Sequence, residues 1–218
     1  MNSNFLSELK RQLTKNGIPS ADPINERLPV LFGGKPIIYA RKDGEVFFDR
    51  NVQQICGADE LYHTVARLAS VVLEYTDLVE QSPLLKADSL QGDFRLLADF
   101  NGAVLAGRKR PENAGYQFVT WNWDYGHTGV TLGHYFEENY LGAKEDFATR
   151  SGLIRKEQIF SPEQMVEIYG CITEQLDNCA DMTQERWRLL SSISAQIEGS
   201  VPTLCGQTEQ SMKPELNL

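Results

Sequence analysis

The chain has 218 residues, of which 41% are hydrophobic, and it carries a formal net charge of −9 at neutral pH. The hydrophobic content supports a packed core and excludes wholesale disorder, while the acidic balance disfavours a general nucleic-acid binder, which needs a basic stripe. The first residues do not resemble a signal peptide and no apolar run is long enough to cross a membrane, so we expect a cytoplasmic protein.

Two segments precede the first predicted strand. Phe5, Leu9 and Leu13 recur at helical spacing, which predicts an amphipathic helix within residues 1–17. Three prolines within residues 18–35 predict an extended linker. On this interpretation the helix docks only loosely on the rest of the chain, or it docks on a neighbouring chain.

A short hairpin and a long helix follow the predicted linker. Strands over residues 37–40 and 45–48 flank Asp43-Gly44, a pair that favours a type I′ turn because both turn positions need positive φ. A continuous apolar stripe then predicts a helix over residues 51–80, which Gly57 divides into a short first part and a long main part.

The centre of the sequence is a predicted antiparallel sheet within residues 94–136. Asn101-Gly102 joins the first two strands and is the strongest short hairpin signal. A polar loop with Pro and Gly precedes the third strand, and a second Gly-containing turn precedes the fourth. The predicted strands span residues 94–100, 103–108, 116–123 and 130–136.

Aromatic side chains lie on both faces of the third predicted strand. Because strand side chains alternate between faces, Trp121 and Trp123 share one face and Tyr116 and Phe118 share the other. Both faces are therefore partly apolar. Either helices cover both faces, or one aromatic face is a binding surface.

The last third of the chain is predicted to be helical. A first helix follows the sheet and ends at Gly152. Ser161-Pro162 with Gln164 matches a capped helix start, since Ser caps the N-terminus and Gln completes a capping box. A further helix follows after a short break, so the two should form an antiparallel hairpin. Residues 200–218 are polar and contain two prolines, which predicts a flexible tail.

Together these elements predict a single α+β domain over residues 36–199. It contains an antiparallel sheet built from hairpins, amphipathic helices packed on that sheet, and a C-terminal helical hairpin. The hairpin at residues 37–48 joins this sheet or flanks it.

Motifs for catalysis or metal binding are nearly absent. The spacings Asp124-x-x-His127 and His134-x-x-Glu137 contain residue types that bind zinc or transfer protons. They match no known motif, and Asp124 equally suits a turn in which its carboxylate caps the backbone. The four cysteines show no metal-ligand spacing. We therefore expect no cofactor and no metal, and we leave open whether the protein is an enzyme.

Acidic residues are concentrated in the helical half of the chain. Residues 137–198 contain 12 Asp and Glu against 6 Lys and Arg, a net charge of 6 − 12 = −6. Acidic residues on amphipathic helices are usually a solvated face. A surface that imitates DNA or docks a basic partner is the alternative interpretation.

Three stretches carry a resemblance to a known family. They are FVTWNWD at residues 118–124, GHYF at 133–136 and AKEDFATRSGL at 143–153. The chain resembles a family of uncharacterised proteins encoded on conjugative and other mobile elements of gut Firmicutes, and the similarity extends to about residue 198. The resemblance implies a cytoplasmic accessory protein of a mobile element, acting in transfer, maintenance or evasion of host defence, and it implies no catalytic residue.

Three functions remain open on this basis. The first is a non-enzymatic accessory protein that binds a macromolecular partner, which we expect to be a protein, with homo-oligomerisation left open. The second is an enzyme or metal-dependent site around Asp124, His127 and His134, and the third is an acidic nucleic-acid mimic that blocks a host DNA-binding protein. The candidate binding residues are Trp121, Trp123, Asp124, Tyr125, His127 and His134.

Overall fold

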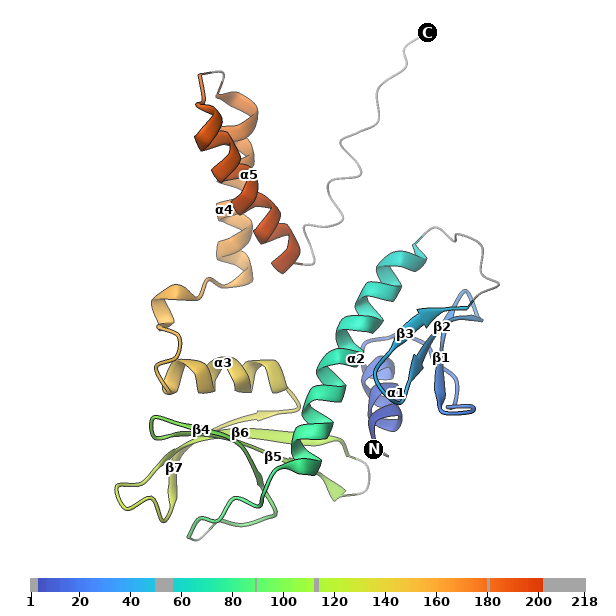
Figure 1. The fold of residues 1–218 in the computed structure, drawn as a ribbon, viewed down its shortest axis with the longest axis vertical. Helices are drawn as coiled ribbons and strands as arrows, with labels where there is room; N and C mark the ends of the chain where they lie inside the picture. The colour runs from blue at the N-terminus through green and yellow to red at the C-terminus, as the bar shows by residue number, and fades with distance from the viewer. Residues whose placement is uncertain (1–3, 50–56, 89, 112–113, 180, 202–218) are drawn as a thin grey trace. The chain divides into compact units, whose positions relative to one another are not determined.

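The computed structural model describes residues 4–49, 57–88, 90–111, 114–179 and 181–201. The chain divides into two compact units, residues Met1–Leu153 and Ile154–Leu218. We refer to them as unit 1 and unit 2. The predicted α+β class is confirmed, with two antiparallel sheets and helices in unit 1 and a helical hairpin in unit 2 (Figure 1).

Unit 1 contains all the described strands. In chain order its elements are α1 (Phe5–Lys15), β1 (Arg27–Phe32), β2 (Lys35–Arg41), β3 (Val46–Phe48), α2 (Ala58–Gln81), β4 (Arg95–Phe100), β5 (Ala103–Lys109), β6 (Tyr116–Trp123), β7 (Val130–Glu137) and α3 (Tyr140–Arg150). Strands β1–β3 form a three-stranded sheet in the order β1-β2-β3, and β4–β7 form a four-stranded meander. The predicted hairpin at residues 37–48 thus belongs to a sheet of its own.

One face of the three-stranded sheet packs on α1 and α2 (Figure 1). Phe5, Leu9 and Leu13 of α1 are completely buried in this core, together with Val65 and Val72 of α2. The prediction that the N-terminal helix docks only loosely, or on a neighbouring chain, is therefore wrong. Its apolar stripe faces the long helix and closes the main core of unit 1.

Segment 18–35, predicted as a linker, instead forms a β-hairpin in which residues 20–24 pair with β1. Asn25 and Glu26 both have positive φ, and Ile24 and Arg27 exchange two backbone hydrogen bonds across them. This is the geometry of a two-residue type I′ turn. Pro29 is tolerated because its carbonyl accepts from Ala21 N on the outer side of β1, so its missing N–H removes no bond to β2.

The two Gly-containing hairpins use different turns. Asn101 and Gly102 both have positive φ, as a type I′ turn requires. At Asp43-Gly44 only Gly44 has positive φ, so the type I′ prediction is wrong there. Gly44 N donates to Arg41 O, and Arg41 N donates to Glu45 O, which closes a three-residue loop.

The two central strands of the four-stranded sheet, β5 and β6, are covered on both faces, but by different parts of the chain. Tyr116 and Phe118 pack against α2 and α3 in the main core. Trp121 on the opposite face packs with Leu85 and Phe94, from the segment before β4. Helices therefore cover one face and an irregular segment covers the other, an arrangement that neither predicted alternative described.

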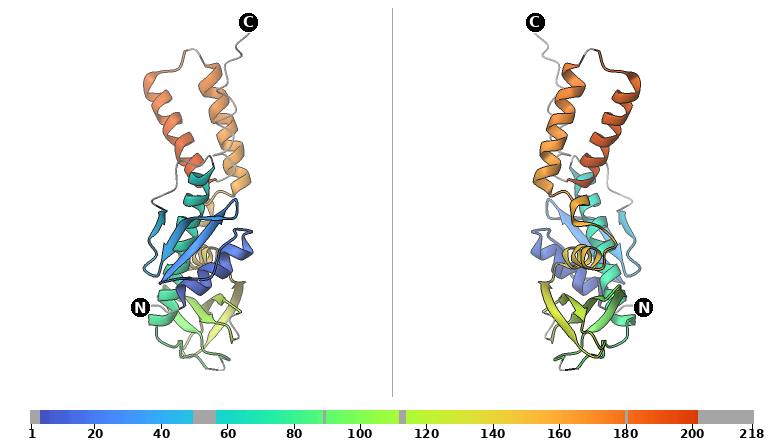
Figure 2. Two further views of the ribbon diagram at one scale, coloured as in Figure 1. Left: turned by 90° about the vertical axis from the view of Figure 1, so that its right-hand side faces the viewer. Right: turned by 90° about the vertical axis from the view of Figure 1, so that its left-hand side faces the viewer.

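Unit 2 contains a short 3₁₀ turn (Lys156–Gln158) and the helices α4 (Pro162–Asn178) and α5 (Gln184–Ser200), which lie side by side as a hairpin (Figure 2). The predicted capping box is present, because Ser161 Oγ accepts from Gln164 N and Gln164 returns a bond to Ser161 N. The division after Leu153 differs from the single domain predicted over residues 36–199. Residues 51–56 of the predicted long helix, and nearly all of the predicted tail, lie outside the described residues.

Candidate functional site

The six residues predicted for binding gather where β6 leads into β7, but most have structural roles. Trp121 is 4% exposed and packs in the core, so it offers no contact surface. Trp123 is half-buried, and its indole Nε1 donates to Asp99 Oδ2 at 3.0 Å. Tyr125 is fully exposed at the tip of the connecting loop.

Asp124 and His127 shape the loop between β6 and β7. Asp124 Oδ1 accepts from Thr128 N at 3.0 Å, and His127 has positive φ with its N–H donated to Asp124 O. Hydrogen bonds from the Gly129 and Thr128 backbone hold the pKa of the Asp124 carboxyl below its ordinary value. The carboxylate therefore caps its own loop, as the turn interpretation predicted.

His134 is held by a residue that sequence reasoning missed. Its Nδ1 lies 3.1 Å from Asp146 Oδ1 on α3, and Asp146 also accepts a short bond from the Thr120 hydroxyl. Arg150 completes the cluster by donating to Thr120 O at 3.0 Å and to Leu132 O at 2.8 Å. The cluster ties α3 to the irregular part of β7, where Leu132 has positive φ.

The structure therefore does not bring Asp124, His127 and His134 together as a catalytic group. The first caps a loop, the second lies against the Trp123 ring at 5.7 Å, and the third pairs with α3. In the described part of the chain, no three His, Cys, Asp or Glu side chains are grouped so that they could hold a metal ion. No described helix is long and apolar enough to cross a bilayer.

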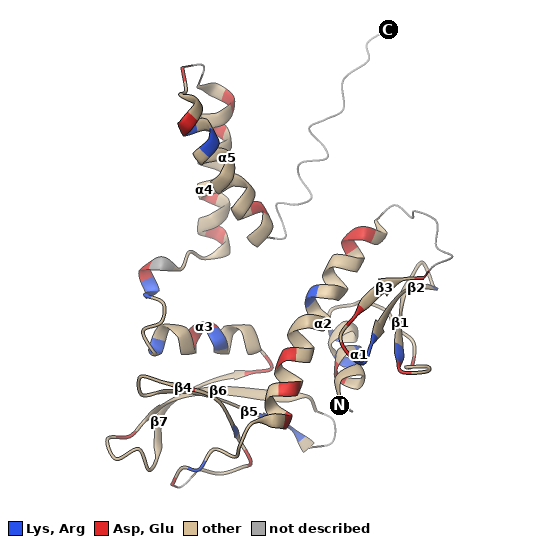
Figure 3. Ribbon diagram, viewed as in Figure 1, with Lys and Arg blue, Asp and Glu red and all other residues tan. Residues whose placement is uncertain are grey.

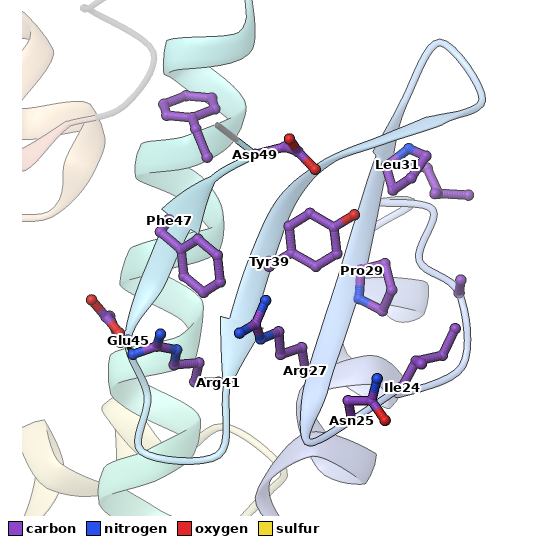
Figure 4. A pocket seen from close by; sticks show the side chains of 13 residues that line it. Ile24, Asn25, Arg27, Pro29, Leu31, Tyr39, Arg41, Glu45, Phe47 and Asp49 are labelled. Carbon is purple, nitrogen blue, oxygen red and sulfur yellow. Dashed lines mark hydrogen bonds and ion pairs between the residues drawn. The ribbon is translucent and has the colours of Figure 1, made fainter. Parts of the chain in front are cut away.

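A hollow in unit 1 lies elsewhere, on the outer face of the three-stranded sheet (Figure 4). We call it the sheet groove. It has a volume of about 1070 Å³, slightly above the roughly 300–1,000 Å³ that is usual for ligand sites. Its lining residues include Ile24, Arg27, Pro29, Leu31, Tyr39, Arg41, Glu45, Phe47 and Asp49.

Strand alternation explains why these side chains share a face. In β1 and β2, Leu28, Val30, Ile38 and Ala40 point into the core and are fully buried. The residues between them must point outward. Cross-strand pairing then aligns Pro29 with Tyr39 and Tyr39 with Phe47, which builds one row across all three strands.

The floor of the groove is aromatic and half-buried. The rings of Tyr39 and Phe47 stack with centroids 5.8 Å apart and planes tilted by 20°. Both side chains are of intermediate exposure. Such a cross-strand pair stabilises the sheet and also leaves ring faces available to a ligand.

Two arginines lie beside this floor and directly opposite each other. Arg27 and Arg41 are cross-strand partners, and their guanidinium carbons lie 5.6 and 5.1 Å from the centroid of the Phe47 ring. Like charges directly opposite in a sheet are destabilising. Arg41 forms an exposed ion pair with Glu45, whereas Arg27 has no ion pair with any residue that the structure describes.

One side of the groove is a wall formed by the residues before β1 that pair with this strand. Leu31 N donates to Pro19 O at 2.8 Å and Ala21 N donates to Pro29 O at 3.0 Å. Lys42 Nζ forms an exposed ion pair with Glu26 Oε1 at 2.6 Å, at the turn that ends this wall. Ile24 remains 62% exposed and provides an apolar edge.

Sequence reasoning missed the groove because it assigned β1 to a linker. The available signal was the alternation of apolar residues at Leu28 and Val30 within RLPVLF. The three prolines of the same segment favoured the linker interpretation instead.

No protein-family model matches the chain, and no curated protein matches it.

Proposed function

We propose that the protein is a non-enzymatic binding protein that engages a protein partner through the sheet groove. The observation that carries the proposal is the arginine pair beside an aromatic floor in a hollow of about 1070 Å³. Aromatic residues and arginine are the side chains enriched at protein interfaces, and they supply much of the binding free energy.

The chemistry of the groove favours a partner segment that carries a carboxylate. Arg27 is exposed and has no ion pair among the described residues, so an incoming carboxylate relieves its repulsion with Arg41. An apolar side chain next to that carboxylate would pack on Tyr39 and Phe47. The groove region does not suit a long nucleic acid, since residues 18–49 contain 4 Lys and Arg against 5 Asp and Glu, a net charge of 4 − 5 = −1.

The resemblance to proteins of mobile elements supports a role as a cytoplasmic accessory protein of such an element. A binding role needs no assembled catalytic group. This agrees with the separate structural roles of Asp124, His127 and His134.

Selection from a random peptide library displayed on phage, with the full-length protein immobilised, tests the proposal. We expect the selected peptides to share an Asp or Glu next to an apolar or aromatic residue. A hydrogen bond to a charged group contributes about 1.5–3 kcal/mol. Arg27→Ala should therefore weaken binding of a selected peptide by about 10- to 100-fold.

Lys35→Ala is the matched control, because Lys35 is an exposed cation of the same sheet outside the groove lining. It should leave the dissociation constant unchanged. Selection of peptides with no acidic residue, or an equal loss of affinity in both variants, contradicts the proposed function.

A further inference from the structure

The side chains that line the sheet groove form three rows, which follow one another along the strands (Figure 4). From one end of the groove to the other, they are Arg27, Arg41 and Glu45, then Pro29, Tyr39 and Phe47, then Leu31, Pro36 and Asp49. Consecutive rows are two residues apart along β1 and along residues 45–49. This spacing arises because alternate side chains of a strand point to the same face.

The third row is built where the pairing of β1 with β2 is irregular. The register shifts after Val30, so that Leu31 is paired with Pro36. Asp49 N donates to Ile37 O at 2.8 Å, next to Pro36. Ile37 is buried in the core and Pro36 is exposed, so Pro36 takes the outward place in this row. The row is therefore apolar apart from the carboxylate of Asp49.

The two ends of the groove differ in charge. The sheet and the turns that join its strands contain residues of both signs (Figure 3). In the first row, Arg27 has no ion pair within the described ranges, whereas Glu45 already pairs with Arg41. In the third row, Asp49 is the charged residue, and Lys35, the other basic residue of β2, does not line the groove. A ligand that spans the groove thus meets a cation at one end and a carboxylate at the other.

An extended peptide has the same repeat as the groove. Its alternate side chains point to one face and recur about 6.6 Å apart, since each residue of a strand rises by about 3.3 Å. Three alternate side chains therefore span about 13 Å and reach all three rows when the peptide runs along the strands. The wall favours this direction, because its residues pair with β1 and follow that strand.

We propose that the groove binds its partner as an extended segment with an acidic, an apolar and a basic residue at alternate positions. This inference rests on the proposed function and adds the order and spacing of the three side chains. The acidic side chain reaches Arg27, and the apolar side chain packs on Tyr39 and Phe47. The basic side chain reaches Asp49. A carboxylate has about four lone-pair positions, so Asp49 can accept from the partner in addition to its contacts within the chain.

Two synthetic peptides of the same composition test the spacing against the full-length protein. The first contains Asp-Ser-Phe-Ser-Lys, and the second contains Asp-Ser-Phe-Lys-Ser, both within the flanking residues of a phage-selected peptide. In the second peptide the Lys side chain points away from the groove when the Asp and Phe side chains enter it. The first peptide should therefore bind about fivefold more tightly, which is the effect of one surface ion pair.

Charge reversal at Asp49 tests the far end of the groove. Asp49→Lys should weaken binding of the first peptide about fivefold. The same variant should bind a peptide with Glu in place of that Lys more tightly than the unsubstituted protein does, because both charges of the pair are exchanged. Asp93→Lys is the matched control, since Asp93 is an exposed acid of unit 1 that precedes β4 and does not line the groove. It should leave both dissociation constants unchanged.

Equal affinities for the two spacings, or an Asp49→Lys variant that weakens the Lys and Glu peptides alike, overturn the inference. If the peptides still require their Asp and Arg27 in that case, the proposed function stands and only the order of side chains is wrong. Peptides that do not bind, or that bind independently of Arg27, refute both the inference and the proposed function.

Discussion

At the scale of single residues, Glu8 is a buried charged group in the core of unit 1. Its carboxylate is 5% exposed and accepts from Tyr75 Oη at 2.6 Å, from Arg11 and from Gln12. Burial, then the negative charge and hydrogen bond of Glu8, raise the pKa of the Tyr75 hydroxyl far above its ordinary value. The hydroxyl therefore stays protonated and donates to the carboxylate.

Glu8→Ala should lower the free energy of unfolding by about 3 kcal/mol, because it leaves the buried Tyr75 hydroxyl without its acceptor. Glu74→Ala is the matched control. Glu74 likewise accepts from a tyrosine, Tyr140, and from a lysine, but it is 41% exposed. Its loss should lower the free energy of unfolding by less than about 1 kcal/mol, and urea titration measures both variants. Equal losses of unfolding free energy in the two variants would show that the burial of Glu8 does not increase its contribution to stability.

At the scale of elements, the sequence predicts turns well only where the local chemistry decides them. Asn101-Gly102 has the predicted type I′ geometry, and the hydrogen bond from Asn101 Nδ2 to Ser151 O is compatible with it. Asp43-Gly44 has the same composition signal but spans one residue more, since Arg41 pairs with Glu45 across it. The turn at Asn25-Glu26 was not predictable, because glutamate rarely adopts positive φ and tertiary pairing with β1 imposes it.

Two glycine substitutions separate backbone conformation from packing. A methyl group at Gly102 or at Gly170 would meet no atom within 4 Å, but Gly102 has φ of +79° and Gly170 lies within α4. Gly102→Ala should cost about 1 kcal/mol through strain. Gly170→Ala should stabilise α4 by a similar amount. Urea unfolding measures both, and changes of the same sign would contradict the assigned backbone conformations.

The candidate site could be predicted only in part, because burial and strand register, which tertiary structure decides, determine which side chains form it. Trp121 and Trp123 stand out in the sequence, yet a buried core needs such rings as much as an interface does, and Trp121 proves buried. Arg27 and Arg41 are far apart in the chain and become neighbours only through the pairing of β1 with β2. A site made by strand register stays hidden until each strand has been identified.

At the scale of the whole molecule, the division into units predicts which fragments fold. Residues 4–153 contain α1, both sheets and the complete main core. We expect this fragment to give dispersed amide resonances and to unfold cooperatively. Residues 36–199, the range of the predicted single domain, lack the buried side chains of α1 and β1 and should not fold. A folded 36–199 fragment would refute the assigned core.

The central claim is that the sheet groove is the contact surface, and an NMR titration of the 4–153 fragment with a selected acidic peptide tests it most directly. If the fragment does not fold, the same titration uses the full-length protein. We predict that the amide shifts that change most lie within residues 24–49, with Tyr39, Arg41 and Phe47 among them, and that Arg27→Ala abolishes the changes at the same peptide concentration. Shift changes confined to residues 124–135 would contradict the claim and assign binding to the loop that carries Tyr125 and His127.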